Sequence, residues 1–385
     1  MSSYILSPAM LGILGGGQLA SMFTIAAKQL GYSVTVLDPD PDAPAGKLAD
    51  VHLCTTYDNQ HALQILAQCA AVTTEFENVS AASMQWLAQY TNVFPSGECV
   101  AVAQDRETEK AWIGKSGLST VPYAMICSIE DLRGDFNALL PGILKTATLG
   151  YDGKGQITVC TQDELVEAFF QLQQVRCILE KKVELKAEIS VVVARQTDGQ
   201  SRCFPVAENI HQNGILAYTL VPARLSVALQ SQAQKMAQQL AEAMNYVGVM
   251  AVEMFVVGTN EELVVNEIAP RPHNSGHYTL DACLSNQFEQ QVRLMCGFAP
   301  AATDLLSPCC MANILGNVWP TKGQPDWSVI LNDRTSKLHL YGKKVARHGR
   351  KMGHFTVLAD DSTLALVKAR TLCEQLMQYT DEANL

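Results

Sequence analysis

The chain has 385 residues and a formal net charge of −10, with 48% hydrophobic and 17% charged residues. This length exceeds what one compact core usually serves, so we expect two or three domains. The composition is that of a globular protein and excludes a largely disordered chain. The negative net charge excludes attraction to nucleic acid by bulk electrostatics, so positive charge for an anionic ligand would have to be concentrated locally.

The sequence also predicts where the protein works. No apolar run approaches the roughly 18 residues of a membrane span, so no membrane association is expected. The first 20 residues carry no basic residue before their apolar stretch, which argues against a signal peptide. Twelve cysteines are scattered without C-x-x-C spacing. We therefore predict a protein of the reducing cytoplasm.

The first 100 or so residues alternate between strand and helix patterns. A strand, a glycine turn and a helix are expected over 9–31, and a second strand begins at residue 32. Further segments of the same alternation are 61–70, 71–79 and 80–90. The pattern predicts a small parallel α/β unit.

The glycine turn of this unit matches a known fingerprint. Gly15, Gly17 and Ala20 fit G-x-G-x-x-A between a strand and a helix, and Asp38 ends the next strand. A bound dinucleotide, another phosphate ligand and a purely structural turn all remain open. The chain departs from a doubly wound continuation after about residue 100, which argues against a dehydrogenase.

The remainder predicts two further units. One long helix is expected over 96–117, and a compact βαββαβ-like module follows, with strands at 118–126, 142–148, 156–159 and 176–183 and a helix at 162–172. Longer strands of antiparallel character come next, at 186–195, 203–210, 247–257 and 262–270. A closing helix is expected over 362–379.

Two carboxylates stand in mirror positions across a predicted hairpin. If the turn is centred on Asn260, Glu253 falls opposite Glu267 on one face of the sheet. Like charges in that position destabilise a sheet, so a counter-charge is expected, and a divalent cation supplies it economically. We predict Mg²⁺, replaceable by Mn²⁺, held by Glu253 and Glu267, with Asn266 as a further candidate ligand. A slipped register with one exposed Glu is the alternative.

A glycine-rich loop, "TLGYDGKGQITV" over 148–159, joins two of the predicted strands. Its glycines let backbone N–H groups approach phosphate oxygens, and Lys154 adds a positive charge. The loop is not a Walker A sequence. Together with the paired carboxylates, it predicts a nucleoside triphosphate site, whereas an idle hairpin is the structural alternative.

These segments resemble the ATP-grasp superfamily, and within it the 5-(carboxyamino)imidazole ribonucleotide synthetase family. "GILGGGQLA", "TTEFENV", "QDRETEK", "GYDGKGQ", "NEIAPRPHNSGHYT" and "GRKMGH" are similar to that family's segments, in the same order. The resemblance implies an N-terminal α/β domain at 1–104, a linker helix and lid at 105–186, and an ATP-grasp domain with an antiparallel sheet at 187–385. It also implies carboxylation of 5-aminoimidazole ribonucleotide with ATP and bicarbonate through carboxyphosphate, and a homodimer.

The resemblance carries ATP-binding roles to matching positions. Arg106 and Lys145 would contact phosphates, Glu188 the ribose, and His211, Asn266 and Glu267 would lie at the nucleotide. The lid loop and adenine hinge would be formed by two runs of residues: Gly150, Tyr151, Asp152, Gly153, Lys154, Gly155 and Gln156, then Glu180, Lys181, Lys182 and Val183.

It carries catalytic and substrate roles too. Arg271, His273 and Asn274 would form the bicarbonate and carboxyphosphate pocket. Asp152 would orient the substrate amine or take its proton, and Tyr151 would close the pocket. The ribonucleotide would be bound by a group that includes the basic stretch near the C-terminus: Gln18, Glu75, Tyr151, Lys343, Arg350 and Lys351, the last of these also catalytic.

Three other functions are alternatives. A formate-dependent glycinamide ribonucleotide transformylase has a different lid loop, without Tyr-Asp before its glycines, and a biotin carboxylase would be longer. A nucleotide-binding regulator without catalysis should have lost a metal carboxylate or the lid lysine. The chain departs from its family at Ala20 and Ser21, where the first loop usually reads Gly and then a basic or polar residue.

Overall fold

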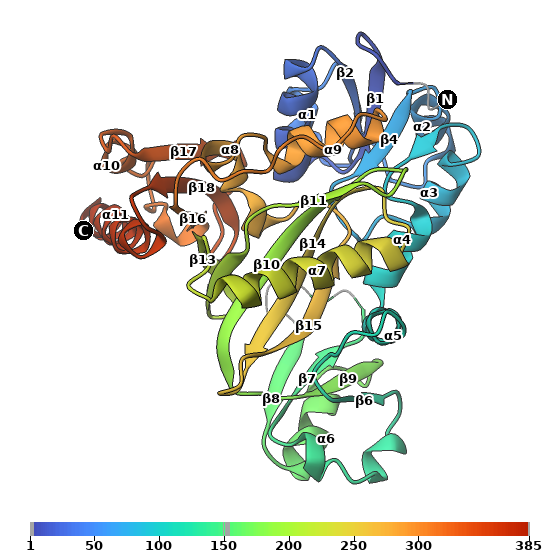
Figure 1. Cartoon of the computed structure of the whole chain (residues 1–385), viewed down its shortest axis with the longest axis vertical. Coiled ribbons are helices and arrows are strands. Elements are labelled where there is room, and N and C mark those ends of the chain that lie inside the picture. Colours follow the sequence, from blue (N-terminus) through green and yellow to red (C-terminus); the bar gives the residue numbers. More distant parts are fainter. Residues whose placement is uncertain (1–3, 149, 151–154, 384–385) are drawn as a thin grey trace.

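The computed structural model describes residues 4–148, 150 and 155–383. Three β-sheets follow one another along the long axis of the molecule (Figure 1). The blue N-terminal sheet lies at one end, the large sheet occupies the middle, and the green lid sheet lies at the other end. This is the mixed α/β architecture, with one parallel and two antiparallel sheets, that the sequence predicts.

The N-terminal sheet is parallel and has the strand order β3-β2-β1-β4-β5. Its central strands are buried because helices cover both faces, as parallel sheets require. The strands are β1 (Met10–Leu14), β2 (Ser33–Leu37), β3 (Val51–Leu53), β4 (Ala71–Thr74) and β5 (Asn92–Val93). The helices are α1 (Gln18–Gln29), α2 (Gln60–Leu66), α3 (Ala81–Leu87) and α4 (Gly97–Gln104).

The single helix expected over 96–117 is wrong, because the chain breaks it at Asp105. Helix α4 ends at Gln104, and α5 (Arg106–Lys115) starts a new direction. Asp105 has an extended backbone, and its carboxylate accepts the N–H of Thr108 at 3.0 Å, so it caps α5. The break places Arg106 at the very start of α5, which lies between the large sheet and the lid sheet (Figure 1).

The lid sheet is antiparallel, with the order β6-β9-β7-β8. Its elements are β6 (Tyr123–Ile126), β7 (Gly142–Thr146), β8 (Gln156–Val159), α6 (Gln162–Gln171) and β9 (Cys177–Lys181). Between β6 and β7 the described chain forms only two short 3-10 turns, so the module lacks the first helix of a βαββαβ unit. The Thr146 N–H donates to the Gly155 carbonyl at 2.9 Å, which closes the base of the loop between β7 and β8.

The large sheet has the order β15-β14-β10-β12-β13-β16-β18-β17, and β11 pairs with β10. The expected strand over 203–210 is split, because Pro205 cannot donate to a ladder. The strands are β10 (Leu185–Arg195), β11 (Ser201–Cys203), β12 (Ala207–Gln212), β13 (Ile215–Val221), β14 (Gly248–Val257), β15 (Glu262–Ala269), β16 (Cys309–Leu315), β17 (Ser336–Leu340) and β18 (Lys351–Leu358).

Helices cover this sheet and join it to the N-terminal unit. Helix α7 (Val227–Ala243) packs its apolar face on β10 and β14, around Met236 and Leu240. Helix α9 (Gln287–Met295) contacts both α1 and β14, so it docks the N-terminal unit (Figure 1). The others are α8 (Thr279–Ala282), α10 (Ser328–Leu331) and α11 (Ser362–Ala383). Across the described chain, every helix is too short or too polar to span a lipid bilayer.

Candidate active site

The site is built around two facing carboxylates on β14 and β15. Glu253 pairs directly with Glu267, which confirms the predicted juxtaposition. The hairpin is not symmetric, however: Val257 pairs with Glu262 and Met254 with Val265, and that register would place Asn266 opposite Glu253. A β-bulge at Asn266 adds one residue to β15 and so brings Glu267 opposite Glu253.

Charged and polar side chains surround this pair. Arg106 Nη1 lies 3.4 Å from the Glu267 carboxylate, and His273 Nε2 lies 3.3 Å from that of Glu253. Burial and the facing charge of Glu267 raise the pKa of Glu253 well above its usual value. The pair is therefore costly in the absence of a cation.

The state of His273 can be inferred from its contacts. Burial, and then Arg271 and Lys351, keep its pKa well below the usual value, so the ring is neutral. Its Nδ1 accepts the backbone N–H of Ser275 at 3.3 Å, and a backbone N–H can only donate. The single ring proton therefore sits on Nε2, from which it faces the Glu253 carboxylate.

The residues present fit a divalent cation. Two carboxylates face each other, and within the described part of the chain the buried Asn266 Oδ1 has no hydrogen-bond partner. Oxygen ligands of this kind suit Mg²⁺, which keeps waters and phosphate oxygens in its shell. A cation would also remove the repulsion that raises the pKa of Glu253.

A buried ion-pair network lies on the lid side of the pair. Glu180, at the end of β9, receives Lys145 Nζ at 2.5 Å on one oxygen and Lys110 Nζ at 2.8 Å on the other. Burial acts to raise the pKa of Glu180, but the two lysines bring it down to about 2. The structure thus brings Lys145, predicted at the phosphates, into contact with Glu180 of the predicted hinge, and adds Lys110, which was not predicted. The nucleotide contacts of Lys145 and Glu180 stay predictions.

The predicted ribose and hinge residues lie along β10, β12 and the chain after β9. His211 Nδ1 is 2.8 Å from the Glu188 carboxylate, and this neighbour raises the pKa of His211 although burial opposes the change. The N–H groups of Lys181 and Lys182 donate to the carbonyls of Pro122 and Pro141 at 2.9 Å. Val183 follows them in the short link to β10.

The three residues predicted for the carboxyphosphate pocket lie in the segment that follows β15, and each has a different partner. Arg271 Nε donates to Glu77 at 2.6 Å, and His273 faces Glu253. The Asn274 amide forms a reciprocal pair with that of Asn313, at 3.0 and 2.8 Å. Contact of these three with bicarbonate stays a prediction.

The glycine turn after β1 is occupied by the chain's own carboxylates. Glu75 accepts the N–H of Gly17, and that of Ala20 at 2.9 Å, while Asp38 accepts the N–H of Gly16 at 2.7 Å. A Cβ on Gly15 or Gly17 would collide with the Glu75 side chain. Of the three alternatives, the described contacts favour the structural turn, since the N–H donors that a phosphate would need already have partners.

Gln18 and Ser21 lie at the start of α1, next to this turn. Ser21, where the chain departs from its family, turns its hydroxyl to the Gly17 carbonyl at 3.1 Å. Gln18 begins α1, next to the turn. Its predicted contact with the ribonucleotide, like that of Glu75, stays a prediction.

The residues of the basic stretch have different partners. Lys343 Nζ donates to the Lys351 carbonyl at 2.8 Å, and Arg350 donates to the Val345 carbonyl at 2.8 Å. Lys344 pairs instead with Asp42 of the N-terminal unit at 2.6 Å. The positive charge of Lys351 also acts to lower the pKa values of Glu253 and His273.

Some predicted residues lie outside the described part of the chain. They are the centre of the lid loop: Tyr151, Asp152, Gly153 and Lys154. Their neighbours Gly150, Gly155 and Gln156 are described, and Gln156 begins β8 opposite Lys145.

Sequence reasoning missed several residues that hold the site together. Glu109 and Lys110 lie in the quoted segment "QDRETEK", three and four positions after Arg106, a spacing that puts all three on one helix face. That signal was available. Glu77 lies in "TTEFENV", but its contact with Arg271 joins residues 194 positions apart and leaves no local signal.

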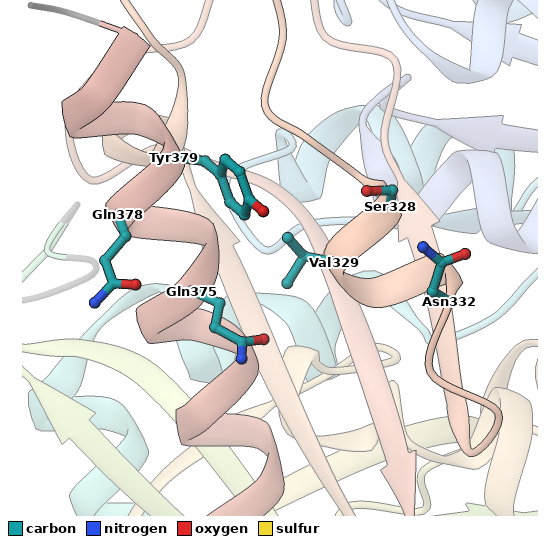
Figure 2. Close-up of a pocket in the computed structure, with 6 residues that line it drawn as sticks. All are labelled: Ser328, Val329, Asn332, Gln375, Gln378 and Tyr379. Atoms are coloured by element: carbon teal, nitrogen blue, oxygen red, sulfur yellow. The ribbon is translucent and has the colours of Figure 1, made fainter.

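A surface hollow of about 450 Å³ lies elsewhere, between α10 and α11. Figure 2 shows its neutral lining, in which Gln375 and Tyr379 of α11 face Ser328 and Asn332. It contains none of the predicted site residues. It is therefore not part of the candidate active site.

Comparison with known families covers most of the chain. An ATP-grasp domain model matches residues 111–288, a ribonucleotide synthetase preATP-grasp domain model matches 9–104, and a phosphoribosylaminoimidazole carboxylase C-terminal domain model matches 309–368. The curated N5-carboxyaminoimidazole ribonucleotide synthase of Bacillus subtilis is 43% identical over 93% of this chain and 94% of its own length.

Solved structures agree. An ADP complex of an N5-carboxyaminoimidazole ribonucleotide synthetase superimposes with a TM-score of 0.91 at 40% identity, covering 99% of this chain and all of the other. An Aspergillus clavatus N5-carboxyaminoimidazole synthase in complex with ADP and 5-aminoimidazole ribonucleotide gives 0.87 at 29% identity, covering 98% of this chain and all of the other. The chain therefore belongs to the N5-carboxyaminoimidazole ribonucleotide synthase family of ATP-grasp ligases.

Proposed function

We propose that this protein uses ATP and bicarbonate to carboxylate the amine of 5-aminoimidazole ribonucleotide, a step of purine biosynthesis. The observation that carries the proposal is the facing pair Glu253 and Glu267, with Arg106 on one carboxylate and neutral His273 on the other. The relatives named above, including one solved with ADP and 5-aminoimidazole ribonucleotide, supply the substrate class.

The reaction has two stages. A bicarbonate oxygen attacks the γ-phosphorus of ATP, the bond to the β-phosphate oxygen breaks, and carboxyphosphate and ADP form. The substrate amine then attacks the carboxyl carbon, phosphate leaves, and the amine loses a proton. Carboxyphosphate is short-lived in water, so a lid that excludes solvent favours the second stage.

The chain's residues supply charge and alignment, which phosphoryl transfer needs most. Mg²⁺ bound by Glu253 and Glu267 would neutralise the charge that develops on the phosphoryl oxygens. Arg106 and Lys145 would position the phosphates, and Glu188 would bind the ribose next to His211. Arg271, whose guanidinium can make two parallel hydrogen bonds, would hold the bicarbonate or carboxyphosphate oxygens.

Other members of the site would serve the second substrate. Lys343, Arg350 and Lys351 would receive the ribonucleotide phosphate, with Glu75 and Gln18 beside the imidazole.

We also propose that the protein is a cytoplasmic homodimer. A transformylase that makes formyl phosphate is less well supported, since the C-terminal family model is that of phosphoribosylaminoimidazole carboxylase.

The direct test is ADP release with each candidate ribonucleotide, with and without bicarbonate. Release that depends on both 5-aminoimidazole ribonucleotide and bicarbonate supports the proposal. Release that requires formate and glycinamide ribonucleotide would assign the other activity. A nucleotide-binding regulator would bind ATP and release no ADP with either set.

The lid loop is expected to respond to nucleotide. If Gly153, Lys154 and Gly155 cover the phosphates, amide hydrogen exchange over 148–156 should slow when ATP is added. Exchange in α11, far from the site, serves as the internal reference. Unchanged exchange across the loop would count against a clamp over ATP.

Asp152 is expected to separate the two stages. If it orients the substrate amine, Asp152→Ala should lower carboxylation on the order of 10²-fold, the usual weight of such a group, and leave ATP binding nearly intact. Bicarbonate-dependent ADP release should persist. Measuring ADP release and ribonucleotide carboxylation side by side decides the matter, and wild-type values for both would remove Asp152 from the mechanism.

A further inference from the structure

Strand β15, which carries Glu267, is the edge strand of the large sheet. Its inner edge pairs with β14, but among residues 4–148, 150 and 155–383 its outer edge has no neighbouring strand beyond an isolated bridge between Thr120 and Val265. An edge strand with a bulge is the least constrained part of a sheet. Something else must hold Glu267 in place.

Helix α5 supplies those contacts on both sides of Glu267. Lys110 Nζ donates to the Asn266 carbonyl at 3.1 Å, and the Ile268 N–H donates to the Glu109 carboxylate at 2.6 Å. Both side chains are almost fully buried, at 3% and 2% exposure for Glu109 and Lys110. The peptide groups before and after Glu267 are therefore fixed by two neighbouring residues of one helix.

The same face of α5 also reaches the carboxylate itself. Arg106 lies one turn before Glu109 and Lys110, and its guanidinium is 3.4 Å from the Glu267 carboxylate. Glu267 is thus held at its side chain and on both sides of its backbone by residues spaced i, i+3 and i+4.

Helix α5 is tied to the lid as well. The Arg106 N–H donates to the Ala147 carbonyl at the base of the lid loop, at 2.9 Å. Lys110 also binds Glu180 of β9, and Arg176, which precedes β9, pairs with Asp105 and Glu107 at 3.0 and 2.7 Å. Lys110 thus binds the lid sheet through Glu180 and strand β15 through the Asn266 carbonyl.

We propose that Glu109 and Lys110 are positioning residues that clamp the bulged backbone around Glu267 and so set the metal site, linking it to the lid through α5. The proposal deepens the metal role given to Glu253 and Glu267 and rests on it. Neither residue has to touch substrate or metal. Their effect should appear as metal affinity, because the clamp fixes where one of two ligands stands.

The test is made on Glu109, since Lys110 also neutralises Glu180. Glu109→Leu removes the acceptor of the Ile268 N–H, whereas Glu109→Gln keeps an acceptor oxygen at the same reach. Lys115→Leu, at the exposed end of the same helix, is the control. The readout is Mn²⁺ binding to the full chain with ADP present, followed by the electron paramagnetic resonance signal of free Mn²⁺.

We expect Glu109→Leu to weaken Mn²⁺ binding by roughly tenfold or more. Glu109→Gln and Lys115→Leu should stay within about threefold of wild type, since losing a partner that orients a metal ligand typically costs about tenfold or more. Binding of ADP without metal, measured by calorimetry, should be unchanged in all three. If Glu109 only stabilised the fold, Glu109→Leu would not change the dissociation constant for Mn²⁺ while leaving ADP binding unchanged.

The outcomes distinguish the clamp from the metal role on which it rests. If wild type binds Mn²⁺ with ADP and Glu267→Gln does not, but Glu109→Leu binds like wild type, the clamp is overturned and the metal role stands. If wild type binds no Mn²⁺, the metal role fails and the clamp falls with it. Should Glu109→Leu not fold, Glu109→Asp, which is too short to reach the Ile268 N–H, decides by the same comparison.

Discussion

Glu267→Gln is expected to lower ribonucleotide-dependent ADP release by about 10³-fold, the upper end of the loss seen when one group that stabilises transition-state charge is removed. The same change should leave the metal-free protein folded, with a thermal midpoint equal to or above that of wild type. The reason is that Glu253 and Glu267 oppose each other directly, and like charges in that position destabilise a sheet.

The measurement pairs ADP release with thermal unfolding in the presence of a chelator. Glu262→Gln, the exposed first residue of the same strand, is the control and should change neither quantity. Near-normal turnover in Glu267→Gln would remove the carboxylate pair from the mechanism. A large drop in the thermal midpoint would mean that the activity loss reports unfolding rather than chemistry.

The carboxylate pair shows how far the sequence alone could reach. The mirror placement of Glu253 and Glu267 predicted the correct partners, although the turn occupies 258–261 and a bulge at Asn266 completes the register. The bulge depends on tertiary contacts, because it requires other elements to hold the outer edge of β15. Here that is α5, whose contacts with Ile268 and Asn266 cannot be read from the strand.

The missed elements have physical causes of the same kind. The break at Asp105 had a local signal, an acidic residue able to cap a helix, but the apolar pattern continues across it and favoured one helix. Helix α7 was not predicted, because its run of glutamines weakens the apolar pattern that packs on β10 and β14. The glycine turn matched a phosphate fingerprint, and only the fold places Glu75 against its N–H groups.

The second large effect is expected at Arg271, which has two separable roles. Its guanidinium is 2.6 Å from Glu77, and it is proposed to hold the carboxyphosphate oxygens. Arg271→Met should abolish carboxylation and also lower the free energy of unfolding by about 2 kcal/mol, because it leaves Glu77 partly buried without its partner. Glu77→Gln in the same chain should restore much of that stability and none of the activity.

The sign of the pH dependence follows from Glu77. Burial acts to raise its pKa, but Arg271 brings it below the usual 4.5, so in wild type the pair's stabilisation is present above pH 4.5 and is lost as pH falls through the lowered pKa. In Arg271→Met the charge that most opposes burial is gone, so the pKa of Glu77 rises. The stability gap between the two proteins should therefore be widest near pH 7 and shrink as the pH falls, first through the raised pKa of Glu77 in the variant and then through its lowered pKa in wild type.

Urea unfolding at pH 7 and pH 4, with ADP release at pH 7, measures both roles in wild type, Arg271→Met, Glu77→Gln and the double variant. A gap that is the same at both pH values would mean that Glu77 is not the group left unpaired. Carboxylation restored in the double variant would mean that Arg271 acts only by neutralising Glu77. Stability restored without activity would instead leave the guanidinium with a task that no apolar side chain can perform, which is to hold an oxyanion beside the metal carboxylates.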